Sequence, residues 1–359
     1  MAVSFTRISQ AAVPDPTFSA RNAVGASSVA SPATKPLNLV YISGAHRSGS
    51  TFLGALLGAD PQAFFVGEAY RFPRPMFWPP DPSRGCSCGV PVERCPFWTE
   101  VRAELERRTP LLERLEEGQY RYERWTKVAS IFGRKDRADA ELDAHVRRMT
   151  EFLRVISAHA DAPTLVESSF SAVRGNLYRH ADLGGGQVRF LHLVRDGRNF
   201  IASERSVTHD PEAPSAWLRT EPVIIGRWVL FNLAAILLGM RAPESYLRVR
   251  YEELMRRPEE TLAEIGAFLR MDLSDVARRA SRGEPIPMRH LAAGNRMRLL
   301  GSVTLRSELA RSPQLPVAST VLFWTLGGWL ALLLGYRPGR RSDRAARSGP
   351  SAGPIRTGP

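Results

Sequence analysis

The chain has 359 residues, of which 43% are hydrophobic and 24% are charged. This composition is typical of soluble globular proteins and excludes collagen-like, wholly disordered and multi-span membrane chains. The formal net charge is +13, but residues 1–36 carry +2 of it and residues 337–359 carry +5, which leaves +6 for the middle. That surplus suits an anionic ligand and does not require nucleic acid. Three cysteines are too few for a disulfide scaffold, so we expect a reducing, cytoplasmic compartment.

Composition divides the chain into four parts. Residues 1–36 are rich in Ala, Ser, Thr, Val and Pro without a period, and we expect a disordered leader there. Residues 37–311 form one folded domain, and residues 312–336 form an apolar C-terminal helix. Residues 337–359, mostly Arg, Gly, Ser, Ala and Pro, are expected to be a disordered basic tail.

Within the domain, short β-branched runs alternate with longer helical stretches. This order predicts an α/β fold with a parallel sheet flanked by helices on both faces. The strand candidates are residues 37–43, 164–166, 188–194 and 246–250. The helix candidates are residues 50–57, 146–159, 199–207, 222–241 and 258–269.

The first strand runs directly into a glycine-rich loop. Gly44 and Gly49, followed by Ser50 and Thr51, have the spacing of a P-loop, whose backbone N–H groups and helix dipole hold a phosphate. Ser50 stands where a nucleoside triphosphatase needs lysine, which disfavours ATP or GTP hydrolysis. Arg47 supplies a different cation on the same loop. A plain strand-to-helix turn is the alternative, but the position directly after a strand favours an anion site.

A second candidate lies where the strand at residues 188–194 ends in Arg195. Ligands of open α/β sheets bind at the carboxyl ends of strands, so we expect Arg195 to project towards the anion of the first loop. Ser203 follows eight residues later, in the next helix. Together the two side chains are suited to a second phosphate. Alone, an arginine after a strand is usually solvated.

The two motifs together resemble the sulfotransferase family that uses 3′-phosphoadenosine 5′-phosphosulfate (PAPS), whose fold is a P-loop NTPase-like parallel sheet. The run from His46 to Thr51 is similar to the loop that binds the 5′-phosphosulfate in that family. Arg195 with Ser203 is similar to the pair that binds the 3′-phosphate. The resemblance covers residues 37 to 300. The donor-binding residues that it implies are Arg47, Ser48, Gly49, Ser50, Thr51, Arg195, Ser203, Gly294, Asn295 and Arg298.

Later motifs extend the resemblance. Residues 249–254 are similar to the family's strand with a Tyr-Glu-Asp-Leu ending, and Gly294, Asn295 and Arg298 resemble its Gly-Asn-x-x-Arg element, which closes over the nucleotide. Arg47 in place of lysine and the segment 86–89 suggest bacterial enzymes related to carbohydrate sulfotransferases. The resemblance implies a hydroxyl or amine acceptor, such as a glycan, a glycolipid or a small molecule.

Two departures from the family pattern stand near the expected site. Residues 166–170 read Val-Glu-Ser-Ser-Phe where relatives commonly show Val-Asp-Ser-Ser-Lys, so Phe170 removes a cation. His46 replaces the usual proline and adds a titratable group to the loop. These departures keep two other functions open: a P-loop kinase, and a nucleotide-binding or polyanion-binding protein without catalysis.

Sulfuryl transfer needs charge stabilisation and a general base. We expect Arg47 to stabilise the leaving phosphate oxygen. Glu68 is the first candidate for the base, because it follows the loop helix at the distance where carbohydrate sulfotransferases carry a catalytic carboxylate. Its alternative role is that of a solvated turn carboxylate. His46 and Glu167 are the next candidates.

Cys86, Cys88 and Cys95 invite a metal interpretation. Structural zinc needs four ligands, and no histidine lies nearby in the sequence, so we expect no metal and interpret the thiols as buried side chains or a disulfide.

The segment 312–336 carries no charged residue and is long enough to span a membrane. The basic tail favours the cytoplasmic side, and a single span would then put the nucleotide-using domain outside. We therefore expect packing on the domain or contact with a membrane surface. The sequence does not indicate an oligomeric state.

Overall fold

The computed structural model describes residues 35–74, 85–108, 110–131, 139–205, 220–306 and 315–338. Nearly all of the expected leader and basic tail lies outside these residues.

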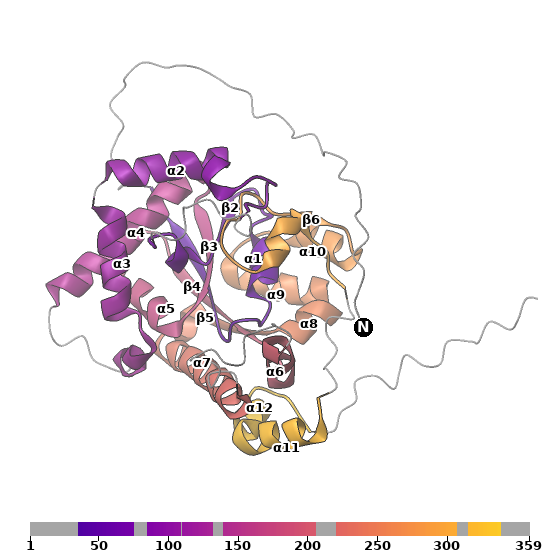
Figure 1. Ribbon diagram of the computed structural model, residues 1–359. Coiled ribbons are helices and arrows are strands. Elements are labelled where there is room, and N and C mark those ends of the chain that lie inside the picture. Colours follow the sequence, from indigo (N-terminus) through magenta and orange to yellow (C-terminus); the bar gives the residue numbers. More distant parts are fainter. Residues whose placement is uncertain are drawn as a thin grey trace, which may run out of the picture.

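A five-stranded sheet forms the centre of the molecule (Figure 1). Its order is β2-β3-β1-β4-β5, and every neighbouring pair is parallel. The strands are β1 (Asn38–Ser43), β2 (Ala63–Gly67), β3 (Thr164–Phe170), β4 (Val188–Val194) and β5 (Tyr246–Arg250). The sheet confirms the predicted fold class. It adds β2, which the sequence analysis missed.

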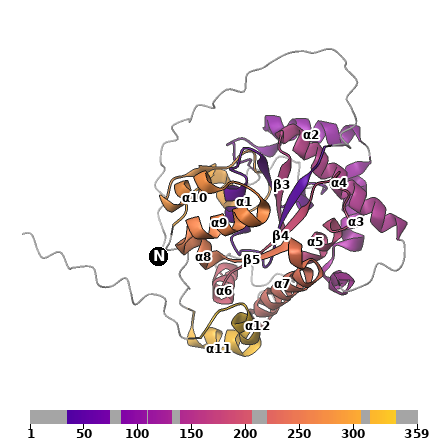
Figure 2. The same ribbon diagram turned by 180° about the vertical axis from the view of Figure 1, so that it is seen from behind.

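Helices cover both faces of the sheet, as the views from opposite sides show (Figures 1 and 2). On β1, Leu39 and Tyr41 join the core cluster that includes α2 to α5, while Val40 and Ile42 join the cluster with α1 and α8 to α10. A strand buried on both faces must be apolar at successive positions, and β1 is. The helices are α1 (Ser50–Leu57), α2 (Pro96–Arg107), α3 (Leu111–Tyr122), α4 (Ala140–Ala160), α5 (Ala172–Tyr178), α6 (Gly197–Arg205), α7 (Glu221–Arg241), α8 (Tyr251–Arg256), α9 (Pro258–Leu269), α10 (Ser274–Ser281), α11 (Val317–Leu326) and α12 (Gly328–Leu333).

The apolar C-terminal segment forms two helices, α11 and α12, that meet at Gly327. α11 packs on α7, where Phe323 is buried and its ring lies 5.5 Å from that of Trp228. The outer side of the pair remains apolar, with Val317 80% exposed and Trp329 54% exposed. Contact of this side with a membrane surface stays a prediction.

One described helix, α7, is long and apolar enough to cross a membrane. Half of its most apolar window is buried inside the protein, against β4, α5 and α11. Its buried residues include Trp228, Ala235 and Leu238. Core helices of soluble proteins have this character, so its hydrophobicity is explained by packing.

Candidate anion-binding and transfer site

The loop between β1 and α1 is held tightly by its neighbours. Gly44, with a φ of 128°, has no room for a side chain, because a Cβ there would lie 2.6 Å from the carbonyl oxygen of Leu193. Gly49 has a φ of 96°, and a Cβ at this position would clash with the ring of Tyr251. No side chain caps the N-terminus of α1, and its first turn contains no acidic residue. The loop therefore presents an uncapped helix N-terminus, which favours an anion.

The fold brings the second motif to this loop. Arg195, which follows β4, donates from Nη1 to the carbonyl oxygen of Arg47 at 3.2 Å, although the two residues are 148 positions apart. Arg47 Nη1 donates to Ser203 Oγ at 3.2 Å. The Arg195 guanidinium stacks 4.3 Å above the ring of Tyr251, and its buried Nε has no hydrogen-bond partner among the described residues. Arg47 thus contacts both residues of the second motif, Arg195 through its carbonyl oxygen and Ser203 through its guanidinium.

Glu204, next to Ser203, is the counter-ion of this cluster. Arg47 Nε lies 2.6 Å from Glu204 Oε1, and Arg227 Nη1 lies 3.3 Å from Oε2. Burial raises the pKa of Glu204, but His46, Arg227 and Arg47 outweigh burial and lower the pKa to about 2. The carboxylate of Glu204 thus faces two arginines, and Arg195 is a third arginine beside the loop. The site therefore has surplus positive charge. Sequence reasoning missed both Glu204 and Arg227; the position next to Ser203 was the one available signal for Glu204.

His46 belongs to the same cluster. Its Nε2 lies 2.8 Å from Arg227 Nη2 and 3.3 Å from Glu204 Oε1. The rings of Phe170, Phe200 and Phe231 surround the imidazole, with centroid distances of 5.8, 4.8 and 5.2 Å. With Nε2 engaged and the ring enclosed, His46 is placed to support the loop. Phe170 fills the space beside it.

Glu68 lies at the same edge of the sheet, directly after β2. Its carboxylate is paired with Arg71, and its side chain is 16% exposed. The backbone N–H of Glu68 donates to the carbonyl oxygen of Ala293 at 3.4 Å, just before Gly294. The N–H of Asn295 then donates to Thr51 Oγ1 at 3.2 Å. The segment 293–295 therefore connects Glu68 to the start of α1.

Arg298 is nearly buried and directs its donors at the backbone. Nη1 donates to the carbonyl oxygen of Gly294 at 3.0 Å, and Nε donates to that of Gly85 at 3.1 Å. Burial and the charge of Arg71 lower the pKa of Arg298. The structure thus uses Arg298 to hold the turn at Gly294 and Asn295.

Glu167, a further candidate for the base, is not placed to act as one. It is fully buried and accepts hydrogen bonds from Arg174 Nε at 2.7 Å and from the hydroxyls of Ser169 and Tyr178, each at 2.5 Å. Arg174 also donates to both oxygens of Glu123, at 2.8 and 2.7 Å. Burial lowers the pKa of Arg174, but the charges of Glu123 and Glu167 outweigh it and raise that pKa well above its usual value. Arg174, Glu167 and Glu123 therefore form a buried network with a structural role.

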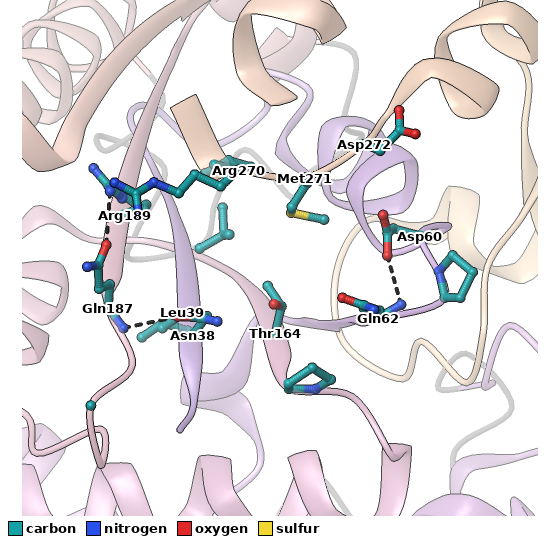
Figure 3. Close-up of a pocket in the computed structure, with 15 residues that line it drawn as sticks. Asn38, Leu39, Asp60, Gln62, Thr164, Gln187, Arg189, Arg270, Met271 and Asp272 are labelled. Carbon is teal, nitrogen blue, oxygen red and sulfur yellow. Dashed lines mark hydrogen bonds between the residues drawn. The ribbon is translucent and has the colours of Figure 1, made fainter. Parts of the chain in front are cut away.

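A cavity of about 620 Å³ lies at the opposite edge of the sheet (Figure 3). Asn38 of β1, Thr164 of β3 and Arg189 of β4 line it, so it opens at the amino ends of the strands. Ligands of open α/β sheets bind at the carboxyl ends, where the anion cluster is. This cavity is therefore separate from the candidate site.

The three cysteines lie together, and the expectation that no histidine accompanies them is wrong. His290 Nδ1 lies 3.3 Å from Cys95 Sγ, across 195 positions of sequence. Cys88 Sγ lies 3.7 Å from Cys95 Sγ, and Cys86 completes the group.

Comparison with protein-family models found no match, and neither did comparison with curated proteins. Comparison with solved structures found bacterial sulfotransferases. The sulfotransferase domain from the Synechococcus PCC 7002 olefin synthase is 19% identical, with a TM-score of 0.44, over 83% of this chain and 96% of that one. The sulfotransferase domain from the curacin biosynthetic pathway is 17% identical, with a TM-score of 0.47, over 85% and 99%. The sulfotransferase STF9 from Mycobacterium avium is 15% identical, with a TM-score of 0.45, over 86% and 78%.

Proposed function

We propose that this protein is a sulfotransferase that moves a sulfuryl group from PAPS to a hydroxyl or amine acceptor. The observation that carries the proposal is the convergence of Arg47, Arg195 and Ser203 beside the uncapped N-terminus of α1. One end of this arrangement suits a phosphosulfate on the loop, and the other suits a second, separate phosphate. A donor with two distinct anionic groups fits both.

In this proposal the donor spans the carboxyl edge of the sheet. The loop N–H groups and Arg47 bind the 5′-phosphosulfate, while Arg195 and Ser203 bind the 3′-phosphate. The turn at Gly294 and Asn295, which contacts Thr51, closes against the loop.

The reaction is an in-line displacement. The acceptor oxygen or nitrogen forms a bond to sulfur as the bond from sulfur to the phosphate oxygen breaks, and adenosine 3′,5′-bisphosphate leaves. Arg47 and the helix N-terminus stabilise the charge that develops on the leaving oxygen. Glu68 takes the acceptor proton, and Arg71 keeps its carboxylate in place.

The arrangement fits a kinase less well. Ser50 occupies the lysine position of a P-loop, and that lysine contacts the β- and γ-phosphates of a triphosphate. Two carboxylates near the loop are already bound to cations: Glu204 to Arg47 and Arg227, and Asp196 to Arg198 at 2.6 Å. Neither is set up to hold magnesium.

A transfer assay tests the proposal. The purified protein is incubated with PAPS and a panel of hydroxyl and amine acceptors, and products are followed by mass spectrometry. We expect a sulfated acceptor and stoichiometric adenosine 3′,5′-bisphosphate. Phosphorylated acceptor formed from ATP and magnesium, without sulfation from PAPS, would replace the proposal with the kinase.

A further inference from the structure

Every cysteine of the chain lies in one cluster with His290. The Sγ atoms of Cys86, Cys88 and Cys95 and a ring nitrogen of His290 all lie within 4.8 Å of one another. Cys88 Sγ lies 3.7 Å from Cys95 Sγ, and Cys95 Sγ lies 3.3 Å from His290 Nδ1. Around a tetrahedral zinc ion, bond lengths of about 2.3 Å to sulfur and about 2.0 Å to nitrogen place neighbouring sulfurs about 3.8 Å apart and sulfur and nitrogen about 3.5 Å apart.

We propose that Cys86, Cys88, Cys95 and His290 bind a structural zinc ion. Three thiolates and one imidazole are a recognised zinc ligand set. All four tetrahedral positions are filled by side chains, which leaves none for water or substrate and makes the site structural. In a reducing compartment, clustered cysteines serve metal binding more often than disulfide formation. The distances of 3.7 Å between Cys88 Sγ and Cys95 Sγ and of 3.3 Å between Cys95 Sγ and His290 Nδ1 are close to those expected around one zinc ion.

The loop that carries the first two thiols is already shaped for such a site. The N–H of Cys86 donates to the carbonyl oxygen of Val90 at 2.8 Å, and the N–H of Gly89 donates to that of Cys86 at 3.0 Å. Gly89, with a φ of 90°, permits this tight turn. Cys95 follows at the N-cap of α2. The backbone thus presents the three thiols on one side.

His290 is fixed independently of any metal. Its ring stacks on that of Phe97 at 5.3 Å with an interplanar angle of 12°, and its carbonyl oxygen accepts a hydrogen bond from Trp98 Nε1 at 2.5 Å. Ser87 and Leu291 exchange backbone and hydroxyl hydrogen bonds at 3.0 and 2.7 Å. These contacts hold the two segments together, so the ligands are preorganised before the ion binds.

The zinc site would join two segments that are far apart in the chain, close to the turn at Gly294 and Asn295. It fastens residues 85–98 to residues 288–295, and Gly294 and Asn295 lie four and five residues after His290. Asn295 in turn contacts Thr51 of the anion loop. Zinc would therefore stiffen the element that, if the proposed function is correct, closes over the donor.

Metal content of the full chain tests the site without reference to activity. The protein is purified with a tag that contains no histidine and analysed by inductively coupled plasma mass spectrometry. We expect about one zinc per chain, and a chelator that removes it should lower the melting temperature. Cobalt in place of zinc should give the thiolate charge-transfer band and the strong d–d bands of a tetrahedral site.

The zinc content of variants tests which residues bind the ion. Cys88→Ser should lose most of the zinc, and Cys88→His, which keeps four ligands, should recover it. His290→Asn should lose zinc, whereas His180→Asn, at an exposed histidine outside the cluster, should keep it. Wild-type protein without zinc that neither binds added zinc nor gains thermal stability from it would overturn the proposal. So would iron in place of zinc, or a disulfide between two of the three cysteines in freshly purified protein.

The zinc result is independent of the proposed function. Zinc with no sulfuryl transfer would leave the metal site intact and remove only the link to the donor. Sulfuryl transfer by protein that binds no zinc would overturn the metal site and leave the proposed function intact.

Discussion

The protein contains two clusters of arginine and glutamate that differ in charge balance and burial. In the inner cluster, Arg174 faces Glu167 and Glu123, and its side chain is 2% exposed. In the outer cluster, Glu204 faces Arg47 and Arg227, and the side chain of Arg47 is 30% exposed. The inner group is buried and holds two carboxylates against one arginine, whereas the outer group has surplus positive charge and access to solvent. The inner cluster is thus a structural network, whereas the charge and exposure of the outer cluster suit the anion binding that we propose.

The largest effect should come from the inner cluster. Arg174→Met leaves Glu167 and Glu123 buried without their cation, which should reduce the free energy of unfolding by about 3–5 kcal/mol. Arg47→Met is the matched change in the outer cluster; because Glu204 keeps Arg227, its cost should be about 0–1 kcal/mol. Urea denaturation measures both. Equal losses would remove the distinction between the clusters.

The next effect concerns turnover. Glu68→Gln keeps shape and hydrogen-bonding reach but accepts no proton at neutral pH, so kcat should fall roughly 10²–10⁴-fold while donor affinity hardly changes. Steady-state kinetics with PAPS measure the change, and Glu100→Gln, at an exposed glutamate on α2, is the control. A Glu68→Gln enzyme with near-normal kcat would remove Glu68 as the base.

Arg195 tests whether the outer cluster distinguishes two phosphates. Arg195→Ala should weaken adenosine 3′,5′-bisphosphate by roughly one to two decades, the equivalent of about 1.5–3 kcal/mol for a charge-assisted contact. It should weaken adenosine 5′-phosphate far less. Calorimetric titration measures both ligands, and Arg198→Ala, which loses its ion pair with Asp196 and its contact with the ring of Trp324, is the control. Equal weakening of the two nucleotides would show that Arg195 does not contact the 3′-phosphate.

The last prediction concerns the pH dependence of the outer cluster. The pKa of Glu204 is lowered to about 2, whereas an unfolded glutamate has a pKa of about 4.3. Its ionised form therefore stabilises the fold above about pH 4.3, and that stability is lost as the pH falls towards about 2. The difference in unfolding free energy between wild type and Glu204→Gln should shrink over this interval. A difference that does not change with pH would contradict the assigned pairing.

The sequence predicted the outer cluster in part because its main motif is local. Residues 50–57 and 258–269 were predicted as helices with the bounds that the structure shows, since glycine spacing and Pro258 mark their starts. β2 was missed because Ala63–Gly67 is a short apolar run without alternation. Such a run cannot be distinguished from other core segments by period.

The sequence analysis did not predict contacts between residues that lie far apart in the chain. His290 joins cysteines some 195 positions away, and Arg227 reaches His46 across 181. No local pattern in one sequence records such pairs, because the tertiary fold creates them. Glu167 is a candidate base in the sequence for the same reason, because its bonds to Arg174 and Tyr178 arise only in the folded chain.

The most direct test of the account is the choice of nucleotide. A ligand that binds only the folded state stabilises it by about 2.7 kcal/mol at one hundred times its Kd. Thermal unfolding of the full chain is measured with adenosine 3′,5′-bisphosphate and with ATP and magnesium at equal concentration. We predict a clear rise in Tm with the bisphosphate and a smaller one with ATP. Equal or greater stabilisation by ATP and magnesium would contradict the assignment of the outer cluster to a sulfuryl donor.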